Sequence, residues 1–264
     1  MQKGNKKNTG KPRIVVVMPA YNAASTLQKT YRDIPTRVVD EVIVVDDSSH
    51  DDTVKVAQRL GLKTFVHPNN LGYGGNQKTC YWEALKTGAH VIVMIHPDYQ
   101  YDATLTDELV RPILSGRFDI MLGSRIRTRA EVLAGGMPIW KYFGNRLLTA
   151  FENMILGLNL SEYHTGFRAF HRDVLHAVPF QRFSNDFVFD QEILVSAASH
   201  NFRIGEIPVP VRYFPEASSI NFSRSVRYGI ATLKTLASYI LHQSGVRQSK
   251  KFKPRARGKK GHDR

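Results

Sequence analysis

The sequence has only one cysteine, Cys80, among 264 residues, so no disulfide can form within the chain. Long apolar runs are also missing, and none reaches the roughly 18 residues that a membrane-spanning helix needs. The N-terminal stretch MQKGNKKNTGK lacks the apolar segment of a signal peptide. Hydrophobic residues nevertheless make up 42% of the chain, enough for a sizeable core. We therefore expect a cytoplasmic protein, either soluble or peripheral to the cytoplasmic membrane face.

Acidic residues are scarce at both ends of the chain. Residues 1–12 contain four lysines and no acid, and residues 249–264 contain eight lysines or arginines and one aspartate. The two ends hold eleven of the fourteen net positive charges. Such ends can act as solubilising extensions, can bind anionic lipid headgroups or can bind nucleic acid. Nucleic acid is the weakest alternative, because Phe252 is the only aromatic residue in either end.

The charge pattern also predicts the domain boundaries. We expect a basic flexible arm at residues 1–12, one folded domain at residues 13–245 and a basic flexible tail at residues 246–264. No internal repeat and no linker interrupts the central part.

Short apolar runs alternate with helical patterns in the first half of the chain. The predicted strands are 14–18, 42–45, 63–68, 91–95 and 118–125. The helical patterns between them are 25–34, 53–61, 77–88 and 103–114. This alternation is typical of an α/β fold with a mostly parallel sheet flanked by helices. In the second half we expect helices at 137–158, 187–200 and 225–243 and an extended segment at 203–213.

Unusual polar clusters follow the predicted strands. They are Tyr21-Asn22, Asp46-Asp47, His96-Pro97-Asp98 and Arg125. Ligands of open α/β sheets bind at the carboxyl ends of the strands. These clusters therefore predict one shared site.

The acidic and glycine-rich stretches each have two interpretations. Asp46 and Asp47 could accept hydrogen bonds from a base or ribose or help to hold a metal, and equally they could cap the helix that follows. The stretch NNLGYGGN matches neither the P-loop nor the GxGxxG pattern. Its glycines would allow the backbone to approach a phosphate, but a structural turn explains them equally well.

His96, Asp98 and Gln100 alternate along the chain, so an extended backbone would point them to one side. A carboxylate, an imidazole and an amide oxygen could together face a divalent cation, and the histidine would favour Mn²⁺ over Mg²⁺. The alternative is that His96 and Asp98 only cap the neighbouring strand and helix.

Basic side chains are abundant after the fifth predicted strand. They are Arg125, Arg127, Arg129, Lys141, Arg146 and Arg168. Arginine binds phosphate through two parallel hydrogen bonds. A solvated basic surface is the alternative, although the strand end at Arg125 is an unusual place for an arginine without a functional role.

Several of these stretches occur together in a recognisable order. They are VVVMPAYNAASTL, EVIVVDDSSHDDT, NNLGYGGN, IHPDYQYD, IMLGSR, HTGFRAF and FDQEIL. In order and spacing the chain resembles the family 2 glycosyltransferases with the GT-A fold, and within them the polyprenyl-phosphate sugar synthases. The resemblance covers about residues 13–220 and implies a single GT-A domain, a nucleotide-sugar donor, inversion at the anomeric carbon and a divalent cofactor, Mn²⁺ or Mg²⁺.

The resemblance also implies roles for individual residues. The nucleotide would be lined by Pro19, Ala20, Tyr21, Asp46, Asp47 and Pro97. Asp98 and Gln100 would be metal ligands, and His96 stands where the family usually has an aspartate. Arg125 would meet the diphosphate as a catalytic cation. The acceptor phosphate would face Lys141, Asn145 and Arg146.

The acceptor remains open at this stage. A polyprenyl phosphate is anionic and needs no general base, whereas a hydroxyl acceptor would need one, for which Asp190 is the candidate. The donor could be GDP-mannose or a UDP-linked sugar. A non-catalytic nucleotide-sugar or nucleic-acid binding protein with a decayed metal site is the alternative from another class. The aromatic helix near Trp140 and the apolar stripe of the last helix either pack in the core or lie on an anionic membrane surface.

Overall fold

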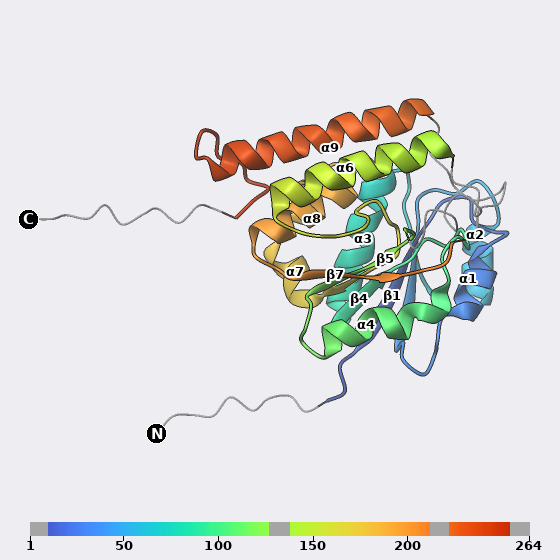
Figure 1. Ribbon diagram of the computed structural model, residues 1–264. Coiled ribbons are helices and arrows are strands. Elements are labelled where there is room, and N and C mark those ends of the chain that lie inside the picture. The colour runs from blue at the N-terminus through green and yellow to red at the C-terminus, as the bar shows by residue number, and fades with distance from the viewer. Residues whose placement is uncertain (1–9, 127–137, 212–221, 254–264) are drawn as a thin grey trace, which may run out of the picture.

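A seven-stranded, mostly parallel sheet forms the centre of the protein (Figure 1). The computed structural model describes residues 10–126, 138–211 and 222–253. The strands are β1 (Ile14–Ala20), β2 (Glu41–Asp46), β3 (Lys63–Val66), β4 (Val91–Met94), β5 (Ile120–Ser124), β6 (Arg168–His171) and β7 (Ile204–Pro208). Their order is β3-β2-β1-β4-β6-β5-β7, and only β6 runs antiparallel to its neighbours. The predicted fold class is confirmed.

Helices cover both faces of this sheet. They are α1 (Leu27–Asp33), α2 (Thr53–Arg59), α3 (Tyr73–Lys86), α4 (Thr106–Leu114), α6 (Ile139–Leu156), α7 (Arg172–Ala177), α8 (Phe189–Ser199) and α9 (Phe222–Gln243), with short 3-10 turns η1 (Ala103–Leu105) and η2 (Phe180–Arg182). α1, α2 and α4 contribute to the core on one face, and α3, α7 and α8 contribute to the core on the other. All seven residues of β1 are buried, as expected for a strand covered on both sides.

α6 and α9 form an additional layer outside α8. Figure 1 shows them side by side along one edge of the molecule. Leu236 of α9 packs with Val195 of α8 and Phe252, and Ile155 of α6 joins this cluster. The predicted helices at 137–158, 187–200 and 225–243 thus correspond to α6, α8 and α9. Among the described residues, no helix is long and apolar enough to cross a membrane.

The chain after α9 folds back onto α8 and α9. His242 donates from Nε2 to the carbonyl of Lys253 at 2.6 Å, and its Nδ1 accepts from the backbone N–H of Ser249 at 3.1 Å. Ser196 Oγ donates to the carbonyl of Lys251 at 2.7 Å, and Phe252 is buried. The packed part of the protein therefore extends to Lys253, beyond the predicted boundary at residue 245. Residues 1–9 and 254–264 of the predicted basic ends lie outside the described residues.

Candidate active site at the carboxyl edge of the sheet

The carboxyl ends of four strands lie at one edge of the sheet. β2 and β4 both pair with β1 in parallel, and β5 points the same way as β4 because both run antiparallel to β6. The polar clusters that follow these strands therefore share an edge, as the sequence predicted. This edge is where open α/β sheets bind ligands.

Of the residues expected to line a nucleotide, only Tyr21 is well exposed, at 50%. Pro19, Ala20, Asp46, Asp47 and Pro97 are buried. Asp46 and Asp47 also stabilise the turn after β2 and the glycine-rich loop before α3, respectively.

Asp46 accepts the backbone N–H of Ser49 at 2.9 Å, which closes the turn after β2. Asp47 accepts the backbone N–H groups of Leu71 at 2.8 Å and Gly72 at 3.0 Å, and His67 Nδ1 lies 2.7 Å from its carboxylate. The second aspartate thus positions the glycine-rich loop before α3. A base or ribose would meet carboxylates that this turn and loop have already oriented.

The glycines of this loop serve close packing. A Cβ on Gly74 would lie 2.4 Å from the carbonyl oxygen of Ser184, and a Cβ on Gly75 would lie 2.8 Å from the side chain of Leu71. The N-terminus of α3 can therefore approach the segment before α8 only without a side chain at Gly74, and Gly75 leaves room for the side chain of Leu71 in the preceding loop. The structure supports the interpretation of NNLGYGGN as a structural turn.

His96 is held in one orientation by a buried hydrogen-bond chain. The hydroxyl of Tyr73 donates to Asp190 Oδ2 at 2.7 Å and lies 3.0 Å from Nε2 of His96. Burial raises the pKa of Tyr73 well above its ordinary value, so its hydroxyl keeps its proton. Because that proton is given to the carboxylate, Nε2 must be the donor to the Tyr73 oxygen. The neutral ring then carries its unshared electron pair on Nδ1.

The imidazole of His96 packs closely against Gly166. A Cβ at position 166 would lie 2.6 Å from Cδ2 of His96 and 3.1 Å from its Nε2. The glycine of HTGFRAF is therefore required by the ring that follows β4. Burial lowers the pKa of His96, which keeps the ring neutral at pH 7 and suited to bind a cation.

Asp98 lies in a tight turn after β4, so the extended backbone expected from His96 to Gln100 is wrong. Its Oδ1 accepts the backbone N–H of Gln100 at 3.1 Å, and Tyr99 between them has a φ of 60°. Burial raises the pKa of Asp98, and the neighbouring positive charges do not cancel that effect. The carboxylate therefore lacks sufficient compensating charge, which a divalent cation would supply.

Within the described ranges, no three or more His, Cys, Asp or Glu side chains are grouped so that they could hold a metal ion. The protein would therefore supply few ligands, with His96, Asp98 and Gln100 as the predicted set. Sites of this kind complete their coordination with substrate phosphates and water. The donor set fits a metal that arrives together with a diphosphate.

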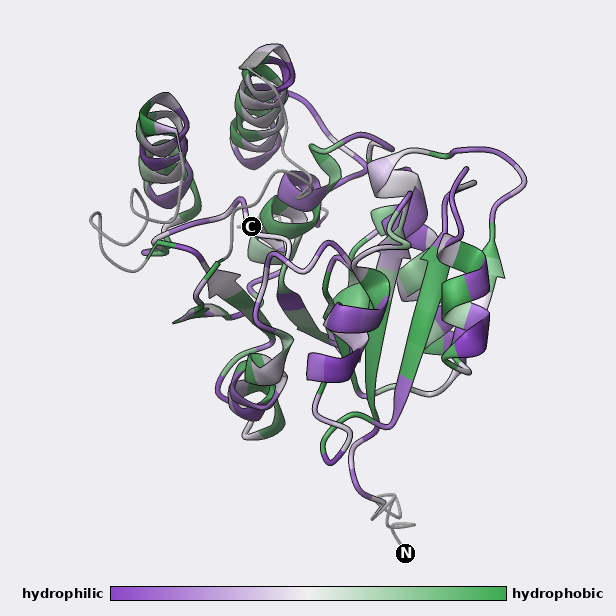
Figure 2. Cartoon of the chain, turned by 90° about the vertical axis from the view of Figure 1, so that its right-hand side faces the viewer, coloured by the Kyte–Doolittle hydropathy of each residue, from purple (hydrophilic) through white to green (hydrophobic). Residues whose placement is uncertain are grey.

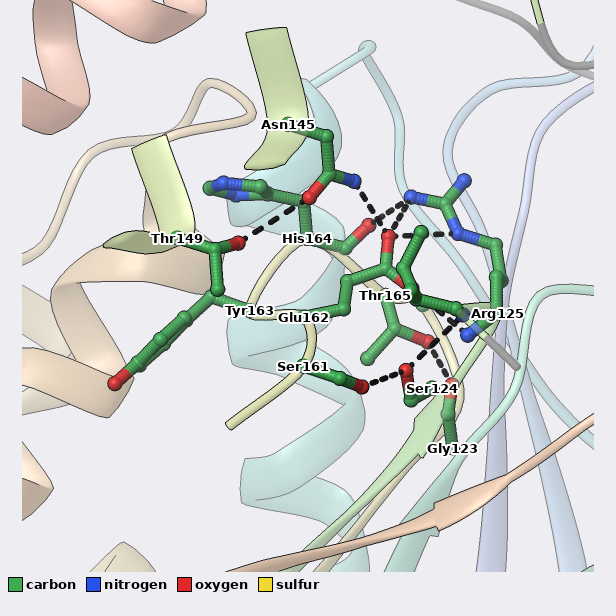
Figure 3. A network of polar contacts seen from close by, with 12 residues as sticks. Gly123, Ser124, Arg125, Asn145, Thr149, Ser161, Glu162, Tyr163, His164 and Thr165 are labelled. Atoms are coloured by element: carbon green, nitrogen blue, oxygen red, sulfur yellow. Dashed lines mark hydrogen bonds and ion pairs between the residues drawn. The ribbon is translucent and has the colours of Figure 1, made fainter. Parts of the chain in front are cut away.

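Arg125, directly after β5, forms a buried ion pair with Glu162 (Figure 3). Its Nε donates to Glu162 Oε1 at 2.9 Å, and its backbone N–H donates to Oε2 at 2.8 Å. Asn145 of α6 donates from Nδ2 to the same Oε1 at 2.7 Å (Figure 3). Burial by itself would raise the pKa of Glu162, but the charge of Arg125 and these hydrogen bonds outweigh it and lower the pKa. Glu162 thus connects the end of β5 to α6.

Lys141 lies close to the same pair. Burial lowers the pKa of Lys141, and the charge of Arg125 lowers it further. The nearby carboxylate of Glu162 acts in the opposite direction and raises the pKa of Lys141. Arg146 points to the same segment and donates to the carbonyl of Ser161 at 2.8 Å. The predicted acceptor residues Lys141, Asn145 and Arg146 therefore lie on α6 beside Arg125, and Arg127 and Arg129 lie outside the described residues.

Comparison with known proteins agrees with this geometry. Residues 15–178 match the model of the family described as Glycosyl transferase family 2. The chain belongs to glycosyl transferase family 2. It is therefore a glycosyltransferase, and an interpretation as a purely non-catalytic binding protein is set aside.

Two relatives and one solved structure show the range of this similarity. A UDP-N-acetylglucosamine–dolichyl-phosphate N-acetylglucosaminyltransferase of Methanococcus voltae is 25% identical over 217 residues, covering 76% of this chain and 86% of the relative. A dolichyl-phosphate hexose transferase of Haloferax volcanii is 27% identical over 202 residues, covering 75% and 82%. Glucosyl-3-phosphoglycerate synthase from Mycobacterium tuberculosis with bound UDP has a TM-score of 0.67 at 22% identity, covering 86% of this chain and 80% of that one. The same synthase has also been solved with Mn²⁺ and UDP.

In this glycosyltransferase, Asp190 is an internal partner of buried groups. Its Oδ2 accepts from Tyr73 and lies 3.3 Å from Nη2 of Arg168, and its Oδ1 accepts from Gln77 Nε2 at 3.0 Å. Arg168 is completely buried and also donates to the backbone carbonyls of Tyr163 and Asp190. Because both carboxylate oxygens have partners, the structure favours a supporting role for Asp190 over proton transfer.

Sequence reasoning missed Glu162 and Tyr73. Both stand next to stretches that were singled out, Glu162 before HTGFRAF and Tyr73 within the glycine-rich loop. The only signal that pointed to Glu162 is that it is an acid next to HTGFRAF in a part of the chain that is rich in basic residues. Nothing local in the sequence indicates that Tyr73 reaches His96, which is 23 residues away.

Proposed function

We propose that this glycosyltransferase transfers a sugar, with inversion, from a nucleotide-sugar donor of the GDP-mannose or UDP-glucose type to a polyprenyl-phosphate acceptor, with the help of a divalent metal. The observation that carries the acceptor class is the proximity of Lys141 to Arg125, whose positive charge lowers the pKa of Lys141, beside buried Glu162. An anionic acceptor relieves the repulsion between these two cations, whereas a neutral hydroxyl does not. The two relatives named for dolichyl phosphate support the same class.

A phosphate acceptor also simplifies the chemistry. Its oxygen is already ionised at pH 7, so it can attack the anomeric carbon without a general base. The new bond forms from carbon to the phosphate oxygen while the bond to the nucleotide diphosphate breaks on the opposite side, which inverts the centre. The basic side chains of α6 would orient the acceptor, and Arg125 would stabilise the charge of the departing diphosphate.

The metal, when bound, would neutralise the negative charge that develops on the leaving diphosphate. His96, Asp98 and Gln100 are the residues proposed to hold it, with Nδ1 as the ligand atom of His96. The hydrogen bond from Nε2 to the Tyr73 oxygen and the close packing of the ring against Gly166 support this orientation. The neighbour that was solved with Mn²⁺ and UDP supports a metal of this type.

A hydroxyl acceptor is the second candidate. It needs a base, and Asp190 was the residue expected to serve as one. The contacts of Asp190 with Tyr73, Gln77 and Arg168 weigh against this alternative, because they engage both carboxylate oxygens.

Two linked measurements test the proposal. In the first, thermal melting is followed with GDP, UDP and their sugar conjugates, with and without Mn²⁺, because a ligand that binds only the native state raises the melting temperature. In the second, transfer of labelled sugar to a short-chain polyprenyl phosphate is measured with the preferred donor. We expect Lys141→Met to raise the KM for the phosphate acceptor while leaving nucleotide binding unchanged. Lys55→Met, at an exposed position of α2, is the matched control. Absence of transfer with every donor and both Mn²⁺ and Mg²⁺ would contradict the proposal.

A further inference from the structure

An unusually apolar outer surface lies on α6 and α9, and the described residues do not cover it. Its members on α6 are Trp140, Phe143, Leu147, Phe151 and Met154. Its members on α9 are Val226, Ile230, Leu233, Ile240 and Leu241. The most exposed of them are Met154 at 71%, Leu147 at 61% and Phe143 at 59%. We call this set the apolar face.

The spacing of these residues places them on one stripe of each helix. Steps of three and four residues return to the same side of an α-helix. The buried residues of the same helices, such as Asn145 and Thr149 on α6 and Thr235 and His242 on α9, lie on the opposite sides. Both stripes therefore point away from the sheet. The apolar pattern of α9 is thus not explained by core packing, which was one of the two interpretations of its sequence.

The two stripes belong to one continuous surface. Figures 1 and 2 both show α6 and α9 side by side at the edge of the molecule. A Cβ on Gly229 of α9 would lie 3.6 Å from Cδ1 of Leu148 of α6, so the helices are in contact where this glycine occurs. Scattered apolar side chains are normal on a surface, but two adjacent stripes of this length mark an interaction site.

The exposed charges on the described helices α6 and α9 are all of one sign. α9 contains Arg224, Arg227 and Lys234 and no aspartate or glutamate. The only acid of α6 is Glu152, which is completely buried. Arg247 and Lys250 extend the exposed basic residues beyond α9. An apolar surface whose own two helices expose cations and no acid matches a bilayer that contains anionic headgroups.

A second copy of this chain fits this surface less well. A symmetric dimer through the apolar face would bring Arg227 and Lys234 of both copies together, and the helices α6 and α9 themselves expose no acid to pair with them. Such like-charge contacts oppose association. The electrostatics therefore favour a lipid surface over self-association.

We propose that α6 and α9 dock this glycosyltransferase onto an anionic lipid bilayer through the apolar face. The role of this docking rests on the proposed function, because it assumes a lipid-phosphate acceptor. α6 also carries Lys141 and Asn145, which lie beside Arg125. Docking through α6 places that cationic site next to the membrane, where the phosphate of a polyprenyl lipid is located. The helix pair would thereby serve as the membrane contact of a chain whose described helices do not span a bilayer.

The first test measures binding of the full-length protein to vesicles of phosphatidylcholine alone and of phosphatidylcholine with phosphatidylglycerol. The Trp82→Phe variant leaves Trp140, on the apolar face, as the only tryptophan. We expect its fluorescence to shift to the blue and to be quenched by brominated lipids when anionic vesicles are added. High salt should weaken binding. Unchanged fluorescence together with no sedimentation of the protein with anionic vesicles would overturn the proposal.

A multiple variant tests the face itself. Phe143→Ser, Leu147→Ser, Ile230→Ser and Leu233→Ser change exposed positions only, so circular dichroism and thermal melting should show an intact fold. We expect at least a tenfold loss of vesicle affinity. The matched control is Val66→Ser with Leu114→Ser, two exposed apolar residues of β3 and α4, and it should bind vesicles as the wild type does. Equal loss in both variants would contradict docking through α6 and α9.

The proposed function and the docking surface can fail separately. The multiple variant should retain nucleotide binding and transfer to a water-soluble, short-chain polyprenyl phosphate. Transfer to that acceptor without any vesicle binding would refute the docking and leave the proposed function standing. Vesicle binding without transfer to that acceptor would refute the proposed function and leave the docking standing. A dimer in light scattering that the multiple variant dissociates, with no binding to vesicles, would assign the apolar face to a second copy instead.

Discussion

Glu162 accepts a hydrogen bond from Nε of Arg125 at 2.9 Å and another from Nδ2 of Asn145 at 2.7 Å through the same carboxylate oxygen (Figure 3). This single atom joins a strand end of the sheet to the helix that carries the predicted acceptor residues. The position of Arg125 relative to Lys141 therefore depends on a side chain that is itself fully buried.

The first prediction concerns this buried carboxylate. Glu162→Gln leaves Arg125 without its ionic partner, and removing one member of a buried ion pair typically costs about 3–5 kcal/mol of stability. We also expect a higher KM for the acceptor, because Arg125 loses its orientation. The control is Asp119→Asn, which breaks an exposed pair with Arg203 and should cost much less.

The same variant has a defined pH dependence. Because the pKa of Glu162 lies below its ordinary value of 4.5, its ion pair stabilises the fold above that pH and is lost as the pH falls through the lowered pKa. The difference in the free energy of unfolding between wild type and Glu162→Gln should therefore be largest at neutral pH and shrink in acid. A difference that is independent of pH would show that Glu162 acts by packing alone.

The second prediction concerns the choice of metal. His96→Asp replaces an imidazole with a hard carboxylate, which should shift the affinity ratio towards Mg²⁺ and away from Mn²⁺ by at least tenfold. Titration calorimetry with each ion in the presence of the preferred nucleoside diphosphate measures this ratio. Tyr73→Phe should weaken binding of Mn²⁺ without reversing the preference, since it removes only the group that orients the ring. An unchanged ratio in His96→Asp would exclude His96 as a ligand.

The third prediction concerns Asp98. Burial raises its pKa above the ordinary value of 3.8, so this group favours the fold below that pH, and the benefit is lost as the pH rises through the raised pKa. Asp98→Asn should therefore raise the melting temperature of the metal-free protein at pH 7 and give no gain in acid. The same variant should lose the stabilisation that Mn²⁺ and nucleotide give to the wild type. A lower melting temperature at pH 7 would argue against an uncompensated carboxylate.

The fourth prediction concerns the packing of His96 against Gly166. Gly166→Ala places a Cβ 2.6 Å from Cδ2 of the ring, so either the imidazole or the backbone must move. We expect a loss of about 1–3 kcal/mol in stability, as for other overpacked sites, together with weaker metal binding. Gly144→Ala in α6 meets no atom within 4 Å and serves as the control. It should stabilise the protein slightly, because alanine is the better helix former.

The fifth prediction separates the two acceptor classes. Asp190→Asn removes the carboxylate that could act as a base. Transfer to a hydroxyl acceptor should then fall by a factor of about 10²–10⁴, whereas transfer to a phosphate acceptor should change much less. Because Arg168 also loses its partner, both assays are run below the melting temperature of the variant. A large loss with the phosphate acceptor in a folded variant would contradict base-free transfer.

The sequence alone determined six of the seven strands, most of the flanking helices and the edge at which the site lies, whereas the antiparallel strand β6 was not predicted. Buried strands and amphipathic helices have local periodic patterns, and the polar residues after β1, β2, β4 and β5 mark the strand ends directly. The order of these stretches also indicated the family. Such features are readable because each depends on neighbours only a few residues away.

The tertiary structure decided which side chains pair. Glu162 meets Arg125 across 37 residues, and Asp190 meets Tyr73 across 117, so no local pattern reveals either contact. It also placed residues 249–253 against α8 and α9 and left the apolar stripe of α9 exposed. Each of these outcomes depends on how separate elements pack against one another, because only packing determines which charges are buried together and which apolar surface remains uncovered.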